Sequence, residues 1–558
     1  MFKEIIINAG EEETRVAVLE NKLLAEVHIE RAVGQRLVGN IFRGRIENVL
    51  PGMQAAFVDI GLEKNAFLYV EDALSPVKTN GQNNITDVVK KGQEIMVQIV
   101  KEPFGTKGPR VTTHLTMPGR YAVLMPTVDY VGISRRIEDE KERERLKEFA
   151  RKVKPAGMGL IMRTMAEGLE EEELGQDIDV LVKLWRKILN KAKNSPAPNL
   201  IHRDLELIQR ILRDVFDPEV NRLIVDARHE YEKIIELLDL SAPHLKCKVI
   251  LEEHDNIFWE YGLEQELEKA LLRKVWLKCG GYLIFDQTEA LTVIDVNTGK
   301  YVGDKNLEET VLRTNMEAAA EIGRQLRLRN IGGIIIVDFI DLEKKENRQK
   351  ILQVLEEEIK KDKTKANILG ITPLGLVEIT RKKARPSLAE VMQKPCPYCE
   401  GRGKVLSEET VGINFKNNIY EFAARTSSPT ILIEAHPAVA ARLIGSGGAN
   451  LKELEQRTGK RLYIRGSTAQ HIEAVTMRPL YDQAGIQAGG FQPVKRGQVL
   501  EVKIEEPHVN KLNDGIARLN GFIVDIEGAG SLVGEIVPVE VSKVYRTYAR
   551  AKLVKRGV

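Results

Sequence analysis

The chain has 558 residues, of which 43% are hydrophobic and 29% are charged, and its formal net charge is +2. This length exceeds what one hydrophobic core fills, and this composition excludes a long disordered chain, so we expect several globular domains. A net charge near zero excludes a uniformly basic chain, so any contact with nucleic acid must come from local patches.

The first residues, 1–8, have the pattern of a short strand, too brief and too charged for a signal peptide or a membrane span. Four cysteines are too few for a disulfide scaffold. We therefore expect a cytoplasmic protein without a membrane span.

Short apolar strands fill the first part of the chain. Residues 1–34 alternate strands with polar turns, and residues 35–117 continue with regularly spaced strands and glycine turns. The strands expected in the second segment lie near 40–49, 55–59, 66–70 and 93–100. This spacing is typical of a five-stranded OB-type barrel. Residues 203–275 alternate helix and short strand, so they are candidates to pair with residues 1–34 across the barrel and the segment 118–202.

Two apolar runs in the middle of the chain end on carboxylates. Residues 290–294 precede Asp295, residues 333–337 precede Asp338, and a helix-period segment at 307–329 separates them. A strand–helix–strand order predicts a parallel pair, and continuous apolar runs predict strands buried on both faces. Both aspartates then lie at the carboxyl edge of one sheet, where α/β proteins place ligands.

Paired carboxylates at one sheet edge favour a divalent cation, because like charges raise each other's pKa unless a cation neutralises them. Mg²⁺ or Mn²⁺ commonly takes one or two carboxylates together with phosphate oxygens, and Asn297 adds a carbonyl oxygen or orients a water. The alternative is that Asp295 and Asp338 only cap the turns that follow them. On residue types alone, this second interpretation is favoured.

The amino-acid sequence around these residues resembles the catalytic core of the ribonuclease E/G family. The stretches that carry the resemblance are 287–299, 324–329 and 332–341. The resemblance implies that Asp295 and Asp338 hold a Mg²⁺ that activates water for attack on an RNA phosphodiester, and that Asn297 supports one of them. It implies a DNase-I-like α/β catalytic domain at 276–394 and leaves Asp341 without a role.

The same resemblance implies an α/β multidomain fold for the whole chain. It places a ribonuclease-H-like structural domain, without a catalytic site of its own, at 1–34 and 203–275. The OB-type barrel at 35–117, which resembles the ribosomal-S-one type of RNA-binding barrel, is inserted in that domain. A region that senses the 5′ end of RNA follows at 118–202. The resemblance is specific up to about residue 405 and weaker beyond.

Five residues of the barrel and the sensor region match RNA-binding positions of the family. Phe57 and Phe67 match aromatic residues that stack on bases, and Lys107 matches a lysine that contacts RNA; without the match, both phenylalanines could belong to the core. Arg163 and Thr164, in Gly-Leu-Ile-Met-Arg-Thr, match the pocket that senses a 5′-monophosphate. A guanidinium fork and a hydroxyl suit a terminal phosphate, and an ordinary surface arginine is the alternative.

Cys396 and Cys399, in Cys-Pro-Tyr-Cys, have the spacing of a zinc knuckle but supply only two of the four ligands that Zn²⁺ needs. Cys247 and Cys279 are isolated, and we expect them to be buried inert thiols. The missing ligands can come from a second copy of the chain. That is the zinc link of the family, here at 395–405, so the resemblance implies a Zn²⁺-bridged homodimer and leaves open a dimer of dimers. A redox pair is disfavoured, because no thioredoxin-like βαβ context surrounds it.

Two small RNA-binding domains are expected after the zinc link. Residues 420–480 resemble a KH-like domain whose glycine loop, from Gly445 to Gly448, clamps single-stranded RNA; the rival is a degenerate element that only packs on the dimer. Residues 490–558 resemble a TRAM domain. Its tail, 541–558, is basic with interleaved tyrosines, which combines charge with stacking surface.

Together these features predict a Mg²⁺-dependent endoribonuclease that cleaves single-stranded RNA, prefers 5′-monophosphorylated substrates, and acts in rRNA maturation and mRNA turnover. One alternative is a non-catalytic RNA-binding or ribosome-assembly factor. Asp295, Asp338 and Asn297 argue against it, because a pure binder gains nothing from carboxylates near phosphate. A metal phosphodiesterase for small nucleotides is a third possibility, which leaves the RNA-binding modules without a purpose.

Overall fold

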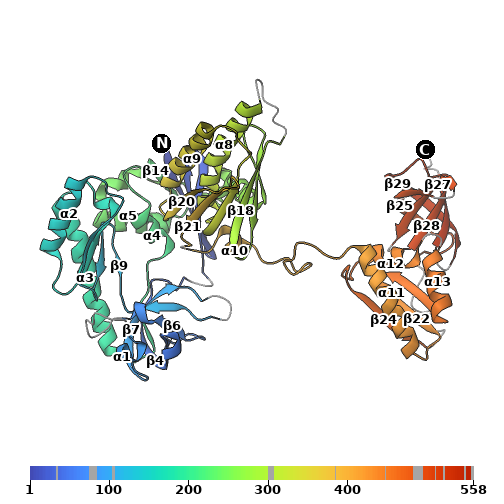
Figure 1. Cartoon of the computed structure of the whole chain (residues 1–558), viewed down its shortest axis with the longest axis horizontal. Coiled ribbons are helices and arrows are strands. Elements are labelled where there is room, and N and C mark those ends of the chain that lie inside the picture. Colours follow the sequence, from blue (N-terminus) through green and yellow to red (C-terminus); the bar gives the residue numbers. More distant parts are fainter. Residues whose placement is uncertain are drawn as a thin grey trace. The chain divides into compact units, whose positions relative to one another are not determined.

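The structure, a computed structural model, consists of two compact units, Met1–Gln393 and Lys394–Val558 (Figure 1). It describes residues 1–32, 36–73, 84–103, 107–299, 307–383, 385–445, 448–481, 494–508, 511–519, 522–545 and 548–554. Among these residues, every helix is too short or too polar to span a lipid bilayer.

A five-stranded sheet joins the start of the chain to its middle. Its strands, in spatial order, are β15 (Val249–Leu251), β14 (Arg222–Val225), β1 (Lys3–Ala9), β2 (Glu13–Glu20) and β3 (Leu23–Arg31). β1 runs parallel to β14, so the expected pairing between residues 1–34 and 203–275 is present. Ile5 and Ile7 face a core with α4 (Leu207–Asp214) and α5 (Arg228–Ser241), whereas Ile6 faces a second core on the other side. Both faces of β1 are therefore covered, which explains its unbroken apolar run.

The predicted OB-like barrel is confirmed. Its five strands are β4 (Ile41–Leu50), β5 (Ala55–Asp59), β6 (Ala66–Tyr69), β8 (Arg110–Thr112) and β7 (Glu94–Lys101), and the pairing of β7 with β4 closes it. A further strand, β13 (Asn199–His202), pairs with β4. The segment 118–202 therefore ends inside the barrel sheet, which its sequence did not indicate.

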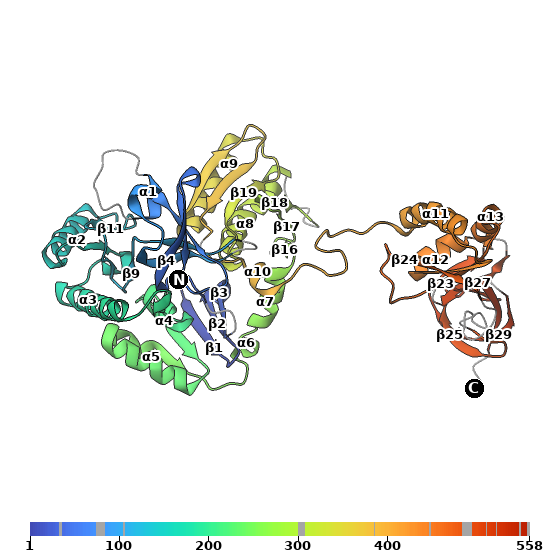
Figure 2. The same cartoon turned by 90° about the horizontal axis from the view of Figure 1, so that it is seen from below.

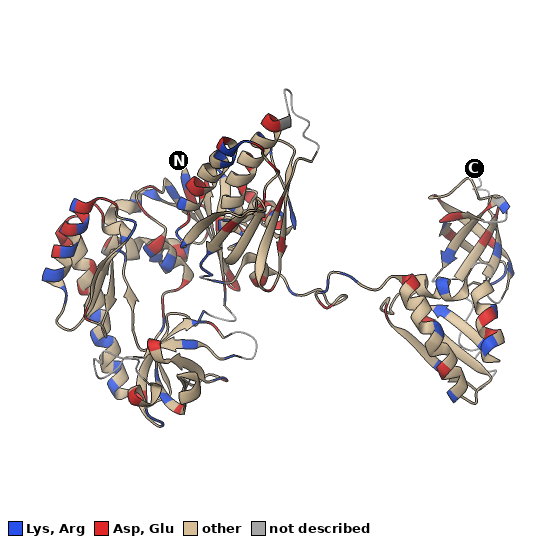
Figure 3. Cartoon of the chain, viewed as in Figure 1, with Lys and Arg blue, Asp and Glu red and all other residues tan. Residues whose placement is uncertain are grey.

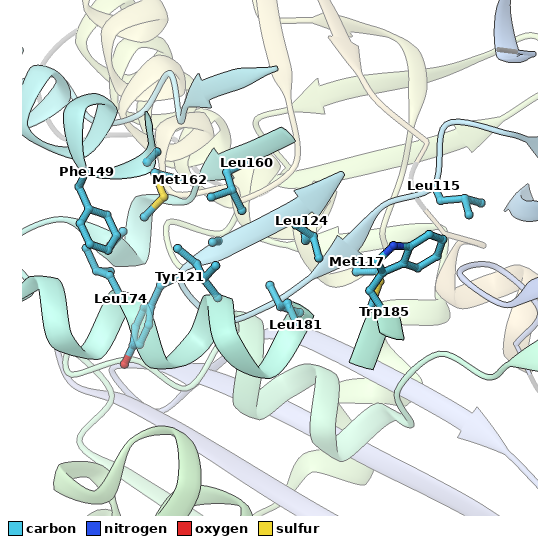
Figure 4. Close-up of a cluster of buried hydrophobic side chains, with 14 of the residues drawn as sticks. Leu115, Met117, Tyr121, Leu124, Phe149, Leu160, Met162, Leu174, Leu181 and Trp185 are labelled. Carbon is cyan, nitrogen blue, oxygen red and sulfur yellow. The ribbon is translucent and has the colours of Figure 1, made fainter. Parts of the chain in front are cut away.

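The segment between the barrel and β13 forms a small sheet covered by two helices. The sheet contains β9 (Met117–Pro118), β10 (Ala122–Met125), β12 (Gly159–Met162) and β11 (Val131–Ile133). Leu174, Leu181 and Trp185 of α3 (Glu171–Asn194) pack in one core with residues of β10 and β12 (Figure 4). The charged side chains of α2 (Glu140–Val153) mix both signs along the helix, as expected for a solvated face (Figure 3).

The sheet that carries the two aspartates is mixed, and two helices pack on one of its faces (Figure 2). Its strands, in spatial order, are β16 (Lys274–Trp276), β17 (Tyr282–Gln287), β18 (Leu291–Asn297), β19 (Gly333–Asp338), β21 (Val377–Arg381) and β20 (Ala366–Ile371). The expectation that β18 and β19 are buried on both faces is wrong. α8 (Leu307–Leu328) and α9 (Lys345–Lys360) both pack against the side of Ile294 and Ile335, so Ile334 on the opposite side stays 51% exposed.

The second unit begins with a three-stranded sheet and its helices. The elements are α11 (Glu408–Arg425), β22 (Thr430–Ala435), α12 (Pro437–Ile444), α13 (Ala449–Thr458), β23 (Arg461–Gly466) and β24 (Val475–Leu480). β22 lies between β23, which is parallel to it, and β24, which is antiparallel. A βαβ unit thus follows the cysteine pair, so one premise used against a redox pair is wrong.

The chain closes with a six-stranded sheet. Its strands, in spatial order, are β25 (Val499–Lys503), β29 (Ile536–Val544), β30 (Tyr548–Leu553), β28 (Phe522–Glu527), β27 (Lys511–Leu519) and β26 (Glu506–His508). β25 also contacts β27, so the sheet curls around a core that includes Val502, Val524 and Val539.

Candidate active site and RNA-binding surfaces

Asp295 and Asp338 lie side by side near the carboxyl ends of two central strands of the sheet. They are register partners in the parallel strands β18 and β19, so the parallel pairing predicted from the strand–helix–strand order is confirmed. The side chains of register partners point to the same face of a sheet, and both aspartates are exposed. Asn297 Nδ2 donates a hydrogen bond of 2.8 Å to Asp295 Oδ2. The three candidate residues of the sequence therefore meet on one face.

The electrostatics of this edge favour a cation. Burial raises the pKa of Asp338, and the negative charges of Asp295 and Asp341 raise it further. A nearby cation relieves such repulsion between carboxylates. The described residues hold no ready cluster of three or more His, Cys, Asp or Glu side chains. The three candidate residues offer two carboxylates and an amide, a set of hard oxygen ligands that fits Mg²⁺.

Close backbone packing positions Asn297. A Cβ atom on Gly281 would lie 2.8 Å from the carbonyl oxygen of Asn297, and a Cβ on Gly299 would lie 2.4 Å from that of Gly280. Gly299 also has a φ of +60°, which favours glycine. Glycines therefore allow the chain before β17 to approach the end of β18.

Asn315 of α8 holds the chain just beyond Asp338. Its Nδ2 donates to the carbonyl of Ile340 at 2.7 Å, and its Oδ1 accepts from the Ile340 N–H at 3.2 Å. Asn315 is fully buried. Sequence reasoning missed this residue, although a polar side chain on the apolar stripe of a helix was a usable signal.

The aromatic residues proposed for the barrel lie outside its core. Phe57 and Phe67 are cross-strand partners on β5 and β6, with ring centroids 6.1 Å apart at 72°. Both are half-buried, whereas their neighbours Val58 and Leu68 fill the core. The alternative that both phenylalanines are core residues is therefore wrong. Lys107 is exposed, close along the chain to β8, which pairs with β6.

Arg163 and Thr164 lie at the end of β12 and have polar partners. Arg163 Nη1 donates to the Gly119 carbonyl at 2.6 Å, and Nη2 lies 2.6 Å from Asp214 Oδ1. The Thr164 hydroxyl lies 2.9 Å from that of Ser134. Sequence reasoning missed Asp214, because it lies on α4, far along the chain, and no local pattern marks it.

Asp214 remains charged despite its surroundings. Burial raises the pKa of its carboxyl, but hydrogen bonds and attraction to Arg213 and Arg163 outweigh this and leave the pKa below its ordinary value. The Arg163 fork is therefore held by a carbonyl and a carboxylate, and its side chain is still 26% exposed. That exposed part is available to an anion.

Cys396 and Cys399 lie in a turn before α11. Cys396 is exposed and Cys399 is half-buried, and the Gly403 N–H donates to Cys399 Sγ at 3.3 Å. Hydrogen bonds from the Cys399 and Tyr398 backbone hold the pKa of the Cys396 thiol below its usual value. The isolated Cys279 is half-buried, but Cys247 is exposed, so the expectation of a buried thiol is wrong for Cys247.

The predicted glycine loop joins α12 to α13. Gly445 and Gly448 both have positive φ, +72° and +79°, and the Gly448 N–H donates to the Gly445 carbonyl at 3.0 Å. The two residues between them lie outside the described residues. In the basic tail, Tyr545 and Tyr548 stack with centroids 4.4 Å apart at 12°, and residues 546–547 and 555–558 lie outside the described residues.

Three family models match the chain. The model of the "Ribonuclease E/G family" matches residues 116–384, and that of the "TRAM domain" matches residues 493–554. Residues 395–479 match "RNase E/G, Thioredoxin-like domain". This last description differs from the KH-like domain expected at 420–480, and RNA contact by its glycine loop stays a prediction.

Relatives are similar over most of this chain. Ribonuclease G of Salmonella typhimurium is 43% identical over 492 residues, which cover 87% of this chain and 98% of that protein. Ribonuclease G of Haemophilus influenzae is 44% identical, covering 83% and 96%. Ribonuclease E of Nostoc sp. is 42% identical, covering 72% of this chain and 59% of that longer protein. With these matches and the paired aspartates in register, the chain belongs to the ribonuclease E/G family.

Proposed function

We propose that this chain is an endoribonuclease that cleaves single-stranded RNA with the help of Mg²⁺. The observation that carries the proposal is the register pairing of Asp295 with Asp338, with Asn297 bonded to Asp295, in a chain 43% identical to a Ribonuclease G over 87% of its length. The TRAM match adds a second reason to expect RNA as the substrate.

Asp295 and Asp338 would hold the Mg²⁺ ion. When bound, Mg²⁺ supplies an activated water and offsets the charge that develops on the phosphate. Asn297 restrains Asp295 through the bond to Oδ2 and leaves Oδ1 available. Asn315 holds the backbone of Ile340, which restrains the segment that carries Asp338 and Asp341. These restraints pre-organise the carboxylates before the substrate arrives.

The substrate would be held at two further places. Phe57 and Phe67 offer half-buried rings for base stacking, with Lys107 as a nearby cation. Arg163 and Thr164 would bind the 5′-monophosphate, because a charged fork and a hydroxyl donor suit a terminal phosphate. This arrangement favours RNA with a 5′-monophosphate and a role in RNA processing and decay.

The subunit arrangement is part of the same proposal. Cys396 and Cys399 supply two thiolate ligands, so a tetrahedral Zn²⁺ site requires two more from a second chain. The active form is then a Zn²⁺-linked homodimer. Gly445 and Gly448 and the C-terminal TRAM domain would add RNA contacts in each subunit.

The test is cleavage of one short A/U-rich single-stranded RNA that carries a 5′-monophosphate or a 5′-triphosphate, with Mg²⁺ or with a chelator. We expect internal cuts that need Mg²⁺ and are faster on the monophosphate. The Asp295→Asn protein should bind this RNA with nearly unchanged affinity but not cut it. Binding without cuts by the unmodified protein would instead make this a non-catalytic RNA-binding factor.

A further inference from the structure

Asn297, two residues after Asp295 on β18, has an aromatic pair beside it on the next two strands. Tyr282 on β17 is the register partner of Asn297, and Trp276 on β16 is the register partner of Tyr282. Cross-strand partners share one face of a sheet, so Trp276, Tyr282 and Asn297 form a row on the face of Asp295. With strands about 5 Å apart, Tyr282 lies one strand and Trp276 two strands from Asn297, roughly 5 and 10 Å away.

A lysine from the neighbouring row packs against both rings: Lys274 is the register partner of Ile284, and Ile284 is that of Asp295. The centroids of Trp276 and Tyr282 are 5.4 Å apart at 66°, an edge-to-face arrangement. Lys274 Nζ lies 3.8 Å from the centroid of the Trp276 ring and 3.6 Å from that of Tyr282. Trp276 is nevertheless 59% exposed. We call Lys274, Trp276 and Tyr282 the aromatic platform.

An aromatic pair across two strands can also serve only to stabilise a hairpin, so a binding role for the platform needs further support. Its position gives that support, since Trp276 and Tyr282 lie in the row of Asn297 and Lys274 lies in the row of Asp295, on the face where the phosphate would be cut. An exposed indole is a poor choice for stability alone, because burying its surface is what stabilises a fold. A cation beside two rings is the combination that single-stranded nucleic acid requires, with stacking for a base and charge for its phosphate.

We propose that the aromatic platform binds a nucleobase next to the scissile phosphate, with Trp276 and Tyr282 as the stacking surface and Lys274 as the cation for the neighbouring phosphate. This inference rests on the proposed function and names a substrate subsite for it. Every base has a π-face, so the platform holds the strand without selecting its sequence.

The first experiment compares intact RNA with RNAs that lack the base on one side or the other of a single mapped cleavage site. The loss of one stacked base should lower the kcat/KM of the unmodified protein about tenfold on one of the two abasic RNAs. The Trp276→Ala protein should lose about as much on intact RNA. The kcat/KM of the Trp276→Ala protein should fall little further on the abasic RNA, because the substitution and the removal of the base delete the same contact.

Matched variants separate stacking from folding. Trp276→Phe should retain most of the kcat/KM, whereas Trp276→Leu, which keeps apolar bulk without a π-face, should behave like Trp276→Ala. Trp259→Ala is the control, because Trp259 is 65% exposed on α6 (Ile257–Glu260). Its kcat/KM should equal that of the unmodified protein on every RNA.

Tryptophan fluorescence measures the contact between Trp276 and RNA directly. The chain has three tryptophans, of which Trp185 is buried. In a Trp259→Phe, Asp295→Asn protein with Mg²⁺, only Trp276 is an exposed tryptophan, and uncut RNA should quench its fluorescence by stacking. RNA that lacks the critical base should quench it less.

The outcomes separate this inference from the proposed function. Absence of Mg²⁺-dependent cuts by the unmodified protein overturns the proposed function, and the inference with it. Normal cutting by that protein, with Trp276→Ala equal to it on intact RNA, overturns the platform alone. A Trp276→Ala protein whose mass in light scattering is lower than that of the unmodified protein makes this face a subunit contact and overturns the inference as well.

Discussion

At the scale of single residues, His28 on β3 is a largely buried histidine with charged neighbours on both sides. Its Nε2 lies 3.4 Å from Glu26 Oε2, and its Nδ1 forms a hydrogen bond with the Arg385 guanidinium. Burial and the nearby Arg385 charge lower the pKa of His28 to about 4, although Glu26 acts in the opposite direction. His28 is therefore mostly neutral in the folded protein above about pH 4.

This lowered pKa predicts a pH dependence of stability. Between about pH 6.5 and pH 4, the unfolded chain binds a proton at His28 that the folded chain does not, so the free energy of unfolding falls as the pH falls. The loss from this residue is on the order of 3 kcal/mol and levels off below about pH 4. His28→Gln should lose less stability than the unmodified protein between pH 7 and pH 5, as measured by urea unfolding. Equal losses in both proteins would contradict this origin.

The contacts of Arg163 lead to a prediction about the preference for 5′-monophosphorylated RNA. The Arg163 fork spans the Gly119 carbonyl and Asp214 Oδ1, each at 2.6 Å, which a lysine cannot span. Arg163→Lys keeps the charge but should reduce the rate advantage of 5′-monophosphate over 5′-hydroxyl RNA about tenfold, in line with the loss of a charge-assisted hydrogen bond. Cleavage of the 5′-hydroxyl RNA is the internal control and should not change. A preserved advantage would remove Arg163 from the 5′-end pocket.

At the scale of secondary-structure elements, a buried ion pair links the sheet of Asp295 and Asp338 to the turn after α9. Arg381 on β21 lies 2.6 Å from Asp362 Oδ2, and the two side chains are 3% and 7% exposed. Arg381 also donates to the carbonyl of Ile331, just before β19. The turn that carries Asp362 also contacts two other parts of the chain. Arg136, just after β11, donates to the Asp362 carbonyl at 2.7 Å, and Lys363 Nζ donates to the Asp214 carbonyl of α4 at 2.9 Å.

Breaking this pair should be costly. Asp362→Ala leaves a buried guanidinium without its carboxylate, which costs about 3–5 kcal/mol of unfolding free energy. The matched control is Glu253→Ala, because Glu253 pairs with Arg228 at 3.0 Å with both side chains more than half exposed. That change should cost less than about 1 kcal/mol. Urea unfolding of both variants makes the comparison, and equal costs would contradict the structural role of the Asp362 pair.

At the scale of the whole molecule, the cysteine turn determines the number of subunits in the proposed function. Cys399→Ser removes one of two thiolates from each chain, so a shared Zn²⁺ site loses two of its four ligands. We expect loss of bound zinc, measured by atomic absorption, and a monomer in sedimentation velocity. Cys247→Ser is the control, because Cys247 is also a free cysteine and lies far from this turn in the chain. A Cys399→Ser protein that remained dimeric without zinc would refute the link.

The sequence by itself determined that Asp295 and Asp338 lie together at the ends of two neighbouring strands. Two apolar runs that end on Asp295 and Asp338, separated by one helix, allow essentially one arrangement, a parallel pair with both carboxylates at one edge. The barrel was predictable for a similar reason, because strand spacing and turn glycines are local signals.

Only the tertiary structure decided which distant residues meet. Asp214 of α4 pairs with Arg163, and β13 pairs with β4 of the barrel although the segment 118–198 separates β13 from the barrel strands in the chain. Burial on one face of β18 and β19 depends on where α8 and α9 pack, which an apolar run does not reveal. The row from Trp276 through Tyr282 to Asn297 depends on the register of three strands, and a shift of one residue would place these side chains on opposite faces. Local sequence determines elements, whereas register and packing determine neighbours.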